Sequence, residues 1–205
     1  MAEISINAQS SIRIDCGSII WADPFRVQKE THDADIILIT HEHFDHFSPE
    51  DIARVRKADT CFAAPLSMKD KLAEAGITDA VMFTPGMSAV MCGITIEAVH
   101  AYNKLKPFHP RKNNWVGYII NADKRIYIAG DTDATEEAAS VTCDIALIPV
   151  GGTYTMDTRQ AAELINTIKP QTAIPTHYGD VVGSPDDGDK FRKLVNSGIN
   201  VEIKL

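Results

Sequence analysis

The sequence predicts an α+β protein in which two β-sheets carry helices on their outer faces. Two observations favour this class. Short apolar segments of strand length come in clusters, and helical segments lie between the clusters instead of alternating strictly with single strands. In addition, 44% of the 205 residues are hydrophobic, enough for a substantial core. We expect a single domain that spans residues 1–205.

The first half of the chain contains most of the predicted strands. We predict them at residues 4–6, 11–16, 18–25, 33–40, 60–65, 80–84, 88–92 and 94–101. A helix is expected at 49–58, because Ser48 can cap it, Pro49 suits its first turn and acidic residues follow. A second helix should cover 68–76 and end at Gly76.

The second half begins with a predicted hairpin of two strands, 115–120 and 125–131, around a polar turn. After it, helices and strands follow one another in shorter succession. We predict helices at 135–140, 158–169 and 189–198, and strands at 143–152, 172–177 and 201–205. Pro170 fixes the end of the middle helix, since proline cannot continue it.

Charge and composition exclude several classes of function. The 20 basic and 28 acidic residues give a net charge of −8, which disfavours a nucleic-acid partner. None of the four cysteines forms a C-x-x-C pair, so they are expected to be reduced thiols in a cytoplasmic protein. No apolar run approaches the roughly 18 residues of a membrane span. We therefore expect a small-molecule substrate and no membrane, and leave open a homo-oligomer.

The segment at residues 40–47, Thr-His-Glu-His-Phe-Asp-His-Phe, places three imidazoles and two carboxylates directly after a predicted buried strand. Alternation on an extended chain would point His41, His43 and Asp45 to one side, where they could bind one metal ion. His46 is adjacent to Asp45, so after a turn both could face a second ion. This spacing suggests a dinuclear site.

Three later residues repeat the pattern of a coordinating side chain at the end of a predicted strand. They are His100, Asp131 and His177. Each alone has an ordinary alternative, since a strand-end histidine is usually a hydrogen-bonded surface residue and Asp131 could cap the following helix. The joint pattern is stronger, because five of the seven histidines lie at strand ends and only His32 and His109 do not.

The H-x-H-x-D-H motif at residues 41–46 resembles the signature of the metallo-β-lactamase superfamily, and the three later residues follow in the superfamily's order. By that resemblance the fold is a four-layer αβ/βα sandwich of two mixed sheets flanked by helices. His41, His43 and His100 would bind one divalent ion. Asp45, His46 and His177 would bind the other, and Asp131 would bridge them.

The resemblance also narrows the function. The true β-lactamases of the superfamily lack an aspartate at the position of Asp131, and its flavodiiron members carry a carboxylate where this chain has His43. The sequence is most similar to the small metal-dependent hydrolases, akin to ascorbate phosphate lactonase. We expect two divalent ions, zinc first and manganese, nickel or iron as alternatives.

The expected reaction is attack by a hydroxide bridging the two metals on a small ester, lactone or phosphodiester, with Asp45 and Asp131 as the catalytic carboxylates. A metal-dependent nuclease and an inactive metal-binding scaffold are the alternatives. Candidate substrate contacts are Tyr102, Asn103, His109 and Tyr154, with Trp115 nearby. The basic segment Lys104–Lys112 could attract a phosphate or carboxylate, or could be a solvated loop.

Overall fold

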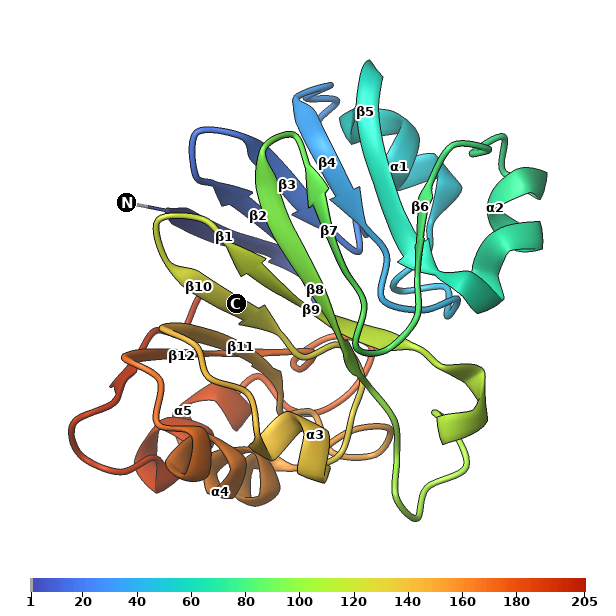
Figure 1. Cartoon of the computed structure of the whole chain (residues 1–205). Helices are drawn as coiled ribbons and strands as arrows, with labels where there is room; N and C mark the ends of the chain where they lie inside the picture. Colours follow the sequence, from blue (N-terminus) through green and yellow to red (C-terminus); the bar gives the residue numbers. More distant parts are fainter. Residues whose placement is uncertain (1) are drawn as a thin grey trace.

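The computed structural model describes residues 2–205 and confirms an α+β sandwich of two mixed sheets. In this part of the chain, one sheet has six strands in the order β1-β2-β3-β4-β5-β6 and the other has seven in the order β13-β12-β11-β10-β9-β8-β7. Figure 1 shows the two sheets face to face, with helices outside them. The predicted four-layer arrangement is therefore correct.

The strands of the first sheet are β1 (Glu3–Ala8), β2 (Ser11–Asp15), β3 (Ile19–Ala22), β4 (Ala34–Leu38), β5 (Arg56–Pro65) and β6 (Val81–Phe83). Those of the second are β7 (Ser88–Met91), β8 (Ile94–His100), β9 (Val116–Asn121), β10 (Arg125–Ile128), β11 (Ile145–Pro149), β12 (Thr172–Thr176) and β13 (Asn200–Val201). In each sheet antiparallel pairs come first and parallel pairs follow: β3 to β6 are parallel, as are β10 to β13.

Helices cover the outer face of each sheet. The five α-helices of the described chain are α1 (Pro49–Val55), α2 (Lys69–Glu74), α3 (Glu136–Ala139), α4 (Thr158–Ile168) and α5 (Asp187–Leu194). Ile52 of α1 and Leu72 of α2 belong to an apolar cluster with Ile37 of β4. Leu164 of α4 packs in a separate cluster with Ile148 of β11. Two 3-10 turns, Leu66–Met68 and Arg111–Asn113, complete the regular structure of residues 2–205.

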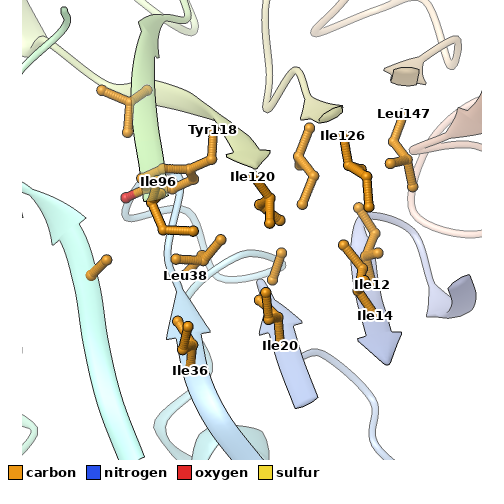
Figure 2. Close-up of a cluster of buried hydrophobic side chains, with 14 of the residues drawn as sticks. Ile12, Ile14, Ile20, Ile36, Leu38, Ile96, Tyr118, Ile120, Ile126 and Leu147 are labelled. Atoms are coloured by element: carbon orange, nitrogen blue, oxygen red, sulfur yellow. The ribbon is translucent and has the colours of Figure 1, made fainter. Parts of the chain in front are cut away.

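The main core lies between the sheets. Alternate residues of β3 and β4, among them Ile20, Ile36 and Leu38, face Ile96 of β8 and Ile120 of β9 (Figure 2). All five side chains are fully buried. Branched aliphatic side chains suit a pleated surface, and their burial is the main favourable term in holding the two sheets together. This core leaves the strand ends free to carry polar side chains.

Several predicted boundaries are wrong. The helix expected at 189–198 covers Asp187–Leu194, and the strand expected at 60–65 already begins at Arg56. The helix expected at 49–58 ends at Val55, because Arg56 is extended (φ −68°, ψ 146°) and starts β5, where it pairs with Ala34. The last strand covers only Asn200–Val201, not 201–205. No helix within residues 2–205 is both long enough and apolar enough to cross a membrane.

Candidate metal centre

Polar side chains gather at one rim of the sandwich, where strands of both sheets end. The segment after β4 carries His41, His43, Asp45 and His46 in the first sheet. From the second sheet, Asp131 follows β10 and His177 follows β12. The amide of Val116, at the start of β9, donates to the carbonyl oxygen of Thr40 at 3.3 Å and ties the two sheets together at this rim.

The segment after β4 turns instead of staying extended. The amides of His46 and Phe47 both donate to the carbonyl oxygen of His43, at 2.9 and 2.8 Å. His41 and His43 share one cluster, as strand alternation predicts. Asp45 does not join them, because the turn carries it to the other side beside His46.

Seven side chains form three overlapping clusters. Within each cluster, the coordinating atoms lie within 4.8 Å of one another. The clusters are His41–His43–His109, His41–His46–Asp131 and Asp45–His46–His177. Asp131 lies between them: its Oδ2 is 3.2 Å from Nε2 of both His109 and His177, and its Oδ1 is 3.3 Å from Nε2 of His46. A carboxylate in this position can bridge two cations.

Three of these coordinating atoms are buried and, despite lying 3.2–3.3 Å from one another's residues, make no hydrogen bond of acceptable geometry within the described chain: Nε2 of His46, Nε2 of His109 and Oδ1 of Asp131. Buried polar groups are costly when nothing pairs with them, so such atoms aimed at one point indicate a ligand. Imidazole and carboxylate donors suit zinc and other first-row divalent ions. The residues present therefore fit a metal centre.

Asp23 and Thr40 form a buried network behind the imidazoles. Asp23 Oδ2 lies 2.7 Å from His46 Nδ1 and accepts the Thr40 hydroxyl hydrogen bond at 2.7 Å, while its Oδ1 accepts from the Thr40 amide at 2.8 Å. The Thr40 hydroxyl is also 3.0 Å from Nδ1 of His41. By holding Nδ1 of both rings, this network leaves each Nε2 directed at the centre.

Sequence reasoning missed Asp23. It follows β3 in the order Trp-Ala-Asp-Pro. The sequence signal is a carboxylate just after a strand, as at Asp131, and here a proline follows it. Its backbone has φ 46°, an unusual conformation for a side-chain-bearing residue. The local strain is held by its amide, which donates to the Leu38 carbonyl oxygen of β4 at 2.9 Å.

Charge in the cluster is divided unevenly between the rings. Burial lowers the pKa of His41 well below its usual value, and the neighbouring His46 adds to this effect. Burial also opposes protonation of His46, but the carboxylates of Asp131 and Asp23 outweigh it and hold the pKa of His46 well above its usual value. Burial would raise the pKa of Asp131, yet His177 and His46 keep it well below the usual range.

His109 lies in the irregular connection between β8 and β9, and the structure fixes it firmly. Asn103 Oδ1 accepts a hydrogen bond from the His109 amide at 3.1 Å and lies 2.9 Å from its Nδ1. The Asn103 amide in turn donates to the His109 carbonyl oxygen at 2.8 Å. The Trp115 ring packs 5.6 Å from the His109 ring and 4.9 Å from that of His41. Asn103 and Trp115 therefore shape the centre from behind.

The structure corrects the assignment of His100. This residue ends β8, but its Nε2 lies 3.0 Å from the Arg111 carbonyl oxygen, and its ring lies 4.9 Å from the Tyr102 ring at an interplanar angle of 57°. It belongs to none of the three clusters, and His109 occupies the place expected for it. The reason is direction: the last residues of β8 alternate faces, and His100 points to the outer groove lined by Arg111 and Glu137.

A family model described as a β-lactamase superfamily domain matches residues 4–177. The chain belongs to the β-lactamase superfamily. The resemblance drawn from the H-x-H-x-D-H motif is thereby confirmed.

Relatives of this superfamily member include proteins assigned as metal-dependent hydrolases. One from Thermoplasma acidophilum is 32% identical over 190 residues, covering 87% of this chain and 84% of its own. One of known structure from Parabacteroides distasonis is 34% identical with a TM-score of 0.84, covering 100% of this chain and 93% of its own. The metallo hydrolase Igni18 of Ignicoccus hospitalis, 24% identical with a TM-score of 0.81, covers 98% of this chain and 94% of its own and shares the fold.

A cavity of about 240 Å³ opens onto the clustered side chains. Tyr154, expected to contact substrate, does line it. Tyr102 does not, because its hydroxyl donates to Glu137 at 3.0 Å in the outer groove. Asn103 is buried behind His109 instead of facing the cavity.

Two of the four basic side chains of the segment Lys104–Lys112 are already paired, and the other two, Lys104 and Lys112, are exposed and do not line the cavity. Lys106 Nζ lies 2.6 Å from both Asp133 Oδ1 and the Thr155 carbonyl oxygen. Arg111 pairs with Glu137 at 2.7 Å in the outer groove. The segment contributes His109 and Phe108 to the cavity instead.

Proposed function

We propose that this metal-dependent hydrolase binds two divalent ions and cleaves a small ester, lactone or phosphodiester. His41, His43 and His109 would hold one ion, and Asp45, His46 and His177 the other. Asp131 would bridge them. The observation that carries the proposal is the central position of Asp131, whose two oxygens face Nε2 atoms belonging to both groups of ligands.

The count of two rests on the number and chemistry of the donors. Seven coordinating side chains exceed the four ligands of one tetrahedral zinc, and the overlap of the three clusters suits two neighbouring ions. Zinc is the first choice because five of the donors are imidazoles, with manganese, nickel or iron as alternatives. When bound, the ions would lower the pKa of a water molecule to about 7 and polarise the scissile carbonyl or phosphoryl oxygen.

The protein groups would then guide proton and substrate. Asp45 lies at the cavity wall with its Oδ2 3.2 Å from Nε2 of His177, in position to orient the attacking water or accept its proton. Asp23 and Asn103 keep the imidazoles from rotating. The nuclease alternative lacks support, since the residues lining the cavity include no lysine or arginine that could follow a phosphate backbone.

Metal analysis tests this function. Wild-type protein, loaded with zinc and freed of excess, should retain about two ions per chain, and Asp131→Asn about one or fewer, with hydrolysis reduced at least a hundredfold. Asp144→Asn, at a carboxylate that accepts from the Arg125 amide far from the cavity, is the matched control and should retain both ions. A wild-type stoichiometry that never exceeds one would contradict the dinuclear proposal.

A further inference from the structure

Four loops each send one apolar or aromatic side chain to the mouth of the cavity. These are Phe44 after β4, Phe108 between β8 and β9, Tyr154 after β11 and Val181 after β12. Phe44 is 66% exposed, Phe108 40% and Tyr154 38%. Phe108 and Tyr154 pack edge to face at 4.8 Å. Large apolar groups that remain exposed together beside reactive side chains mark a ligand-binding surface.

Among the described residues, no lysine or arginine lines this mouth, and Lys104 on the loop of Phe108 is exposed but is not part of the cavity wall. Lys106, on the same loop as Phe108, is held by Asp133 and Thr155. Arg26 pairs with Asp180, next to Val181 in sequence. An anionic substrate would therefore meet apolar rings and the carboxylates of Asp45 and Asp131 at the entrance, and only the bound ions could attract it.

We propose that the substrate is an uncharged ester or lactone whose apolar acyl or alkyl group is held by Phe44, Phe108, Tyr154 and Val181. This inference rests on the proposed hydrolase function and selects the carbonyl class within it. Water adds to the carbonyl carbon, the acyl–oxygen bond breaks, and the proton released by water reaches the departing alkoxide.

The size of the cavity limits the apolar group. A volume of about 240 Å³ corresponds to roughly eight water-sized volumes, so a portion of about eight non-hydrogen atoms can enter. Each buried methylene should then improve binding about three- to fourfold until the space is full.

A series of uncharged esters with one common leaving group and acyl chains of increasing length tests the substrate class. We expect kcat/KM to rise about three- to fourfold per methylene at first and then level off. A phosphodiester with the same leaving group, measured on the same preparation, should be cleaved at least a hundredfold more slowly. Equal or faster cleavage of the phosphodiester would overturn the inference.

Two substitutions at the mouth assign the effect to these rings. Phe108→Ala should flatten the dependence on chain length while sparing kcat for the shortest ester, because it removes the apolar contact and leaves the metal ligands in place. Phe108→Arg should lower kcat/KM for long esters and raise it for the anionic phosphodiester. Val90→Ala, at a residue of β7 that is 70% exposed, is the matched control and should retain the wild-type dependence.

A direct binding measurement separates this inference from the proposed function. Calorimetry with zinc-loaded protein and uncharged aliphatic ketones, which cannot be hydrolysed, should give affinities that rise with chain length and fall in Phe108→Ala. If no ester or diester is cleaved but ketone binding follows this pattern, the hydrolase function fails and the apolar site stands. If esters are cleaved without any dependence on chain length or on Phe108, the apolar site fails and the function stands.

A second, independent observation concerns two cysteines at the other end of the sandwich. Cys61 of β5 and Cys92 of the turn between β7 and β8 come from different sheets, yet their sulfur atoms lie 3.3 Å apart. Cys92 is exposed, so a small molecule can reach it. Its sulfur also lies 3.8 Å from the Asp35 carbonyl oxygen, near the start of β4, whereas the metal-binding segment follows the end of that strand.

We infer that Cys61 and Cys92 form a reversible disulfide that joins the two sheets, by exchange with a low-molecular-weight disulfide. One protein thiolate attacks the small disulfide and releases one small thiol. The second protein thiolate then displaces the other, so that two protein thiols are oxidised and one small disulfide is reduced to two thiols.

Thiol counting and peptide mapping test the disulfide. Excess glutathione disulfide at pH 9 should reduce the number of free thiols from four to two, link the peptides of Cys61 and Cys92, and raise the melting temperature by about 5 °C or more. Burial and the neighbouring Cys61 thiol raise the pKa of Cys92 to about 11, so the same exchange should be much slower at pH 7.

Cys143→Ser should form the same linkage. Cys143 packs against the cluster on the outer face of the second sheet, far from Cys61 and Cys92. Cys92→Ser should keep the remaining thiols free of any internal disulfide and show no rise in melting temperature. A wild-type protein that carries glutathione on Cys92 without linking it to Cys61, or that retains four free thiols, would overturn the inference.

Discussion

At the scale of single residues, two histidines that lie close in sequence, one at the end of β8 and one in the connection to β9, occupy different sites. His100 ends β8 and faces the outer groove, whereas His109, nine positions later, reaches the centre because Asn103 clamps it at both its amide and its Nδ1. The sequence favours His100 as a ligand because it ends a predicted strand. Nothing in the local pattern of residues 101–110 indicates a loop that folds back on itself, so the sequence supports His109 only as a candidate substrate contact.

Removing each histidine separately decides between them. His109→Ala should lose about one zinc ion per chain and reduce hydrolysis by at least a hundredfold, because it removes a donor from the His41–His43–His109 cluster. His100→Ala should retain the wild-type zinc content and activity within about twofold. Elemental analysis of both variants under the same loading conditions measures this, and loss of metal from the His100 variant alone would refute the site described above.

His46 should couple metal loading to pH. Its pKa in the metal-free fold is raised by Asp131 and Asp23, so it holds a proton at pH 7 that a metal at Nε2 must displace. The proton stabilises the metal-free fold below pH ~6.5, and this stabilisation is lost as pH rises through the raised pKa. Zinc affinity should accordingly increase from pH 6 to 8, and calorimetry in buffers of different ionisation enthalpy should detect proton release at pH 7.

Asp23→Asn tests the origin of this coupling. The variant keeps the shape of the side chain but removes a carboxylate 2.7 Å from His46 Nδ1. Proton release should decrease, and zinc affinity should fall about 10- to 100-fold because the ring loses its orienting partner. Asp33→Asn, at a carboxylate paired with Arg13 on the surface, should change neither quantity. Unaltered affinity in the Asp23 variant would show that Thr40 alone orients the ring.

At the scale of elements, the sequence predicted which segments are strands better than where the chain turns. Strand patterns depend on alternating burial, which Ile20, Ile36 and Leu38 display in the sequence itself. The left-handed conformation of His177 (φ 57°) is not encoded by any such pattern. It depends on a neighbour: Gly151, after β11, leaves room for the His177 carbonyl oxygen, and a Cβ there would lie 2.2 Å from it.

Gly151→Ala should therefore weaken metal binding, although Gly151 is not itself a ligand. The added methyl must displace the His177 backbone, which should lower the free energy of unfolding by about 2–3 kcal/mol and weaken the metal bound by Asp45, His46 and His177. Gly86→Ala is the matched control, because its Cβ would meet nothing within 4 Å and only the positive φ (86°) costs energy, about 1 kcal/mol. Chemical denaturation and zinc titration of both variants separate steric displacement from backbone strain.

At the scale of the whole molecule, the candidate centre joins the two sheets. His41, His43, Asp45 and His46 come from the first sheet, while His109, Asp131 and His177 come from the second. An ion bound by donors from both sheets binds the folded chain and not the unfolded one, so it stabilises the fold by mass action. At a free metal concentration 100 times the dissociation constant, this stabilisation is about 2.7 kcal/mol.

Chelation should thus lower the melting temperature of the zinc-loaded protein by about 5–10 °C, since 1 kcal/mol shifts a domain of this size by roughly 2–4 °C. The decrease should reverse when zinc is restored. In His46→Ala/His109→Ala, which removes a donor from each half of the centre, chelation should have little effect. Scanning calorimetry before and after chelation measures the shift. A loaded wild-type protein whose melting temperature does not respond would mean that its ions bind the unfolded chain as tightly as the folded one, which would contradict a centre assembled from both sheets.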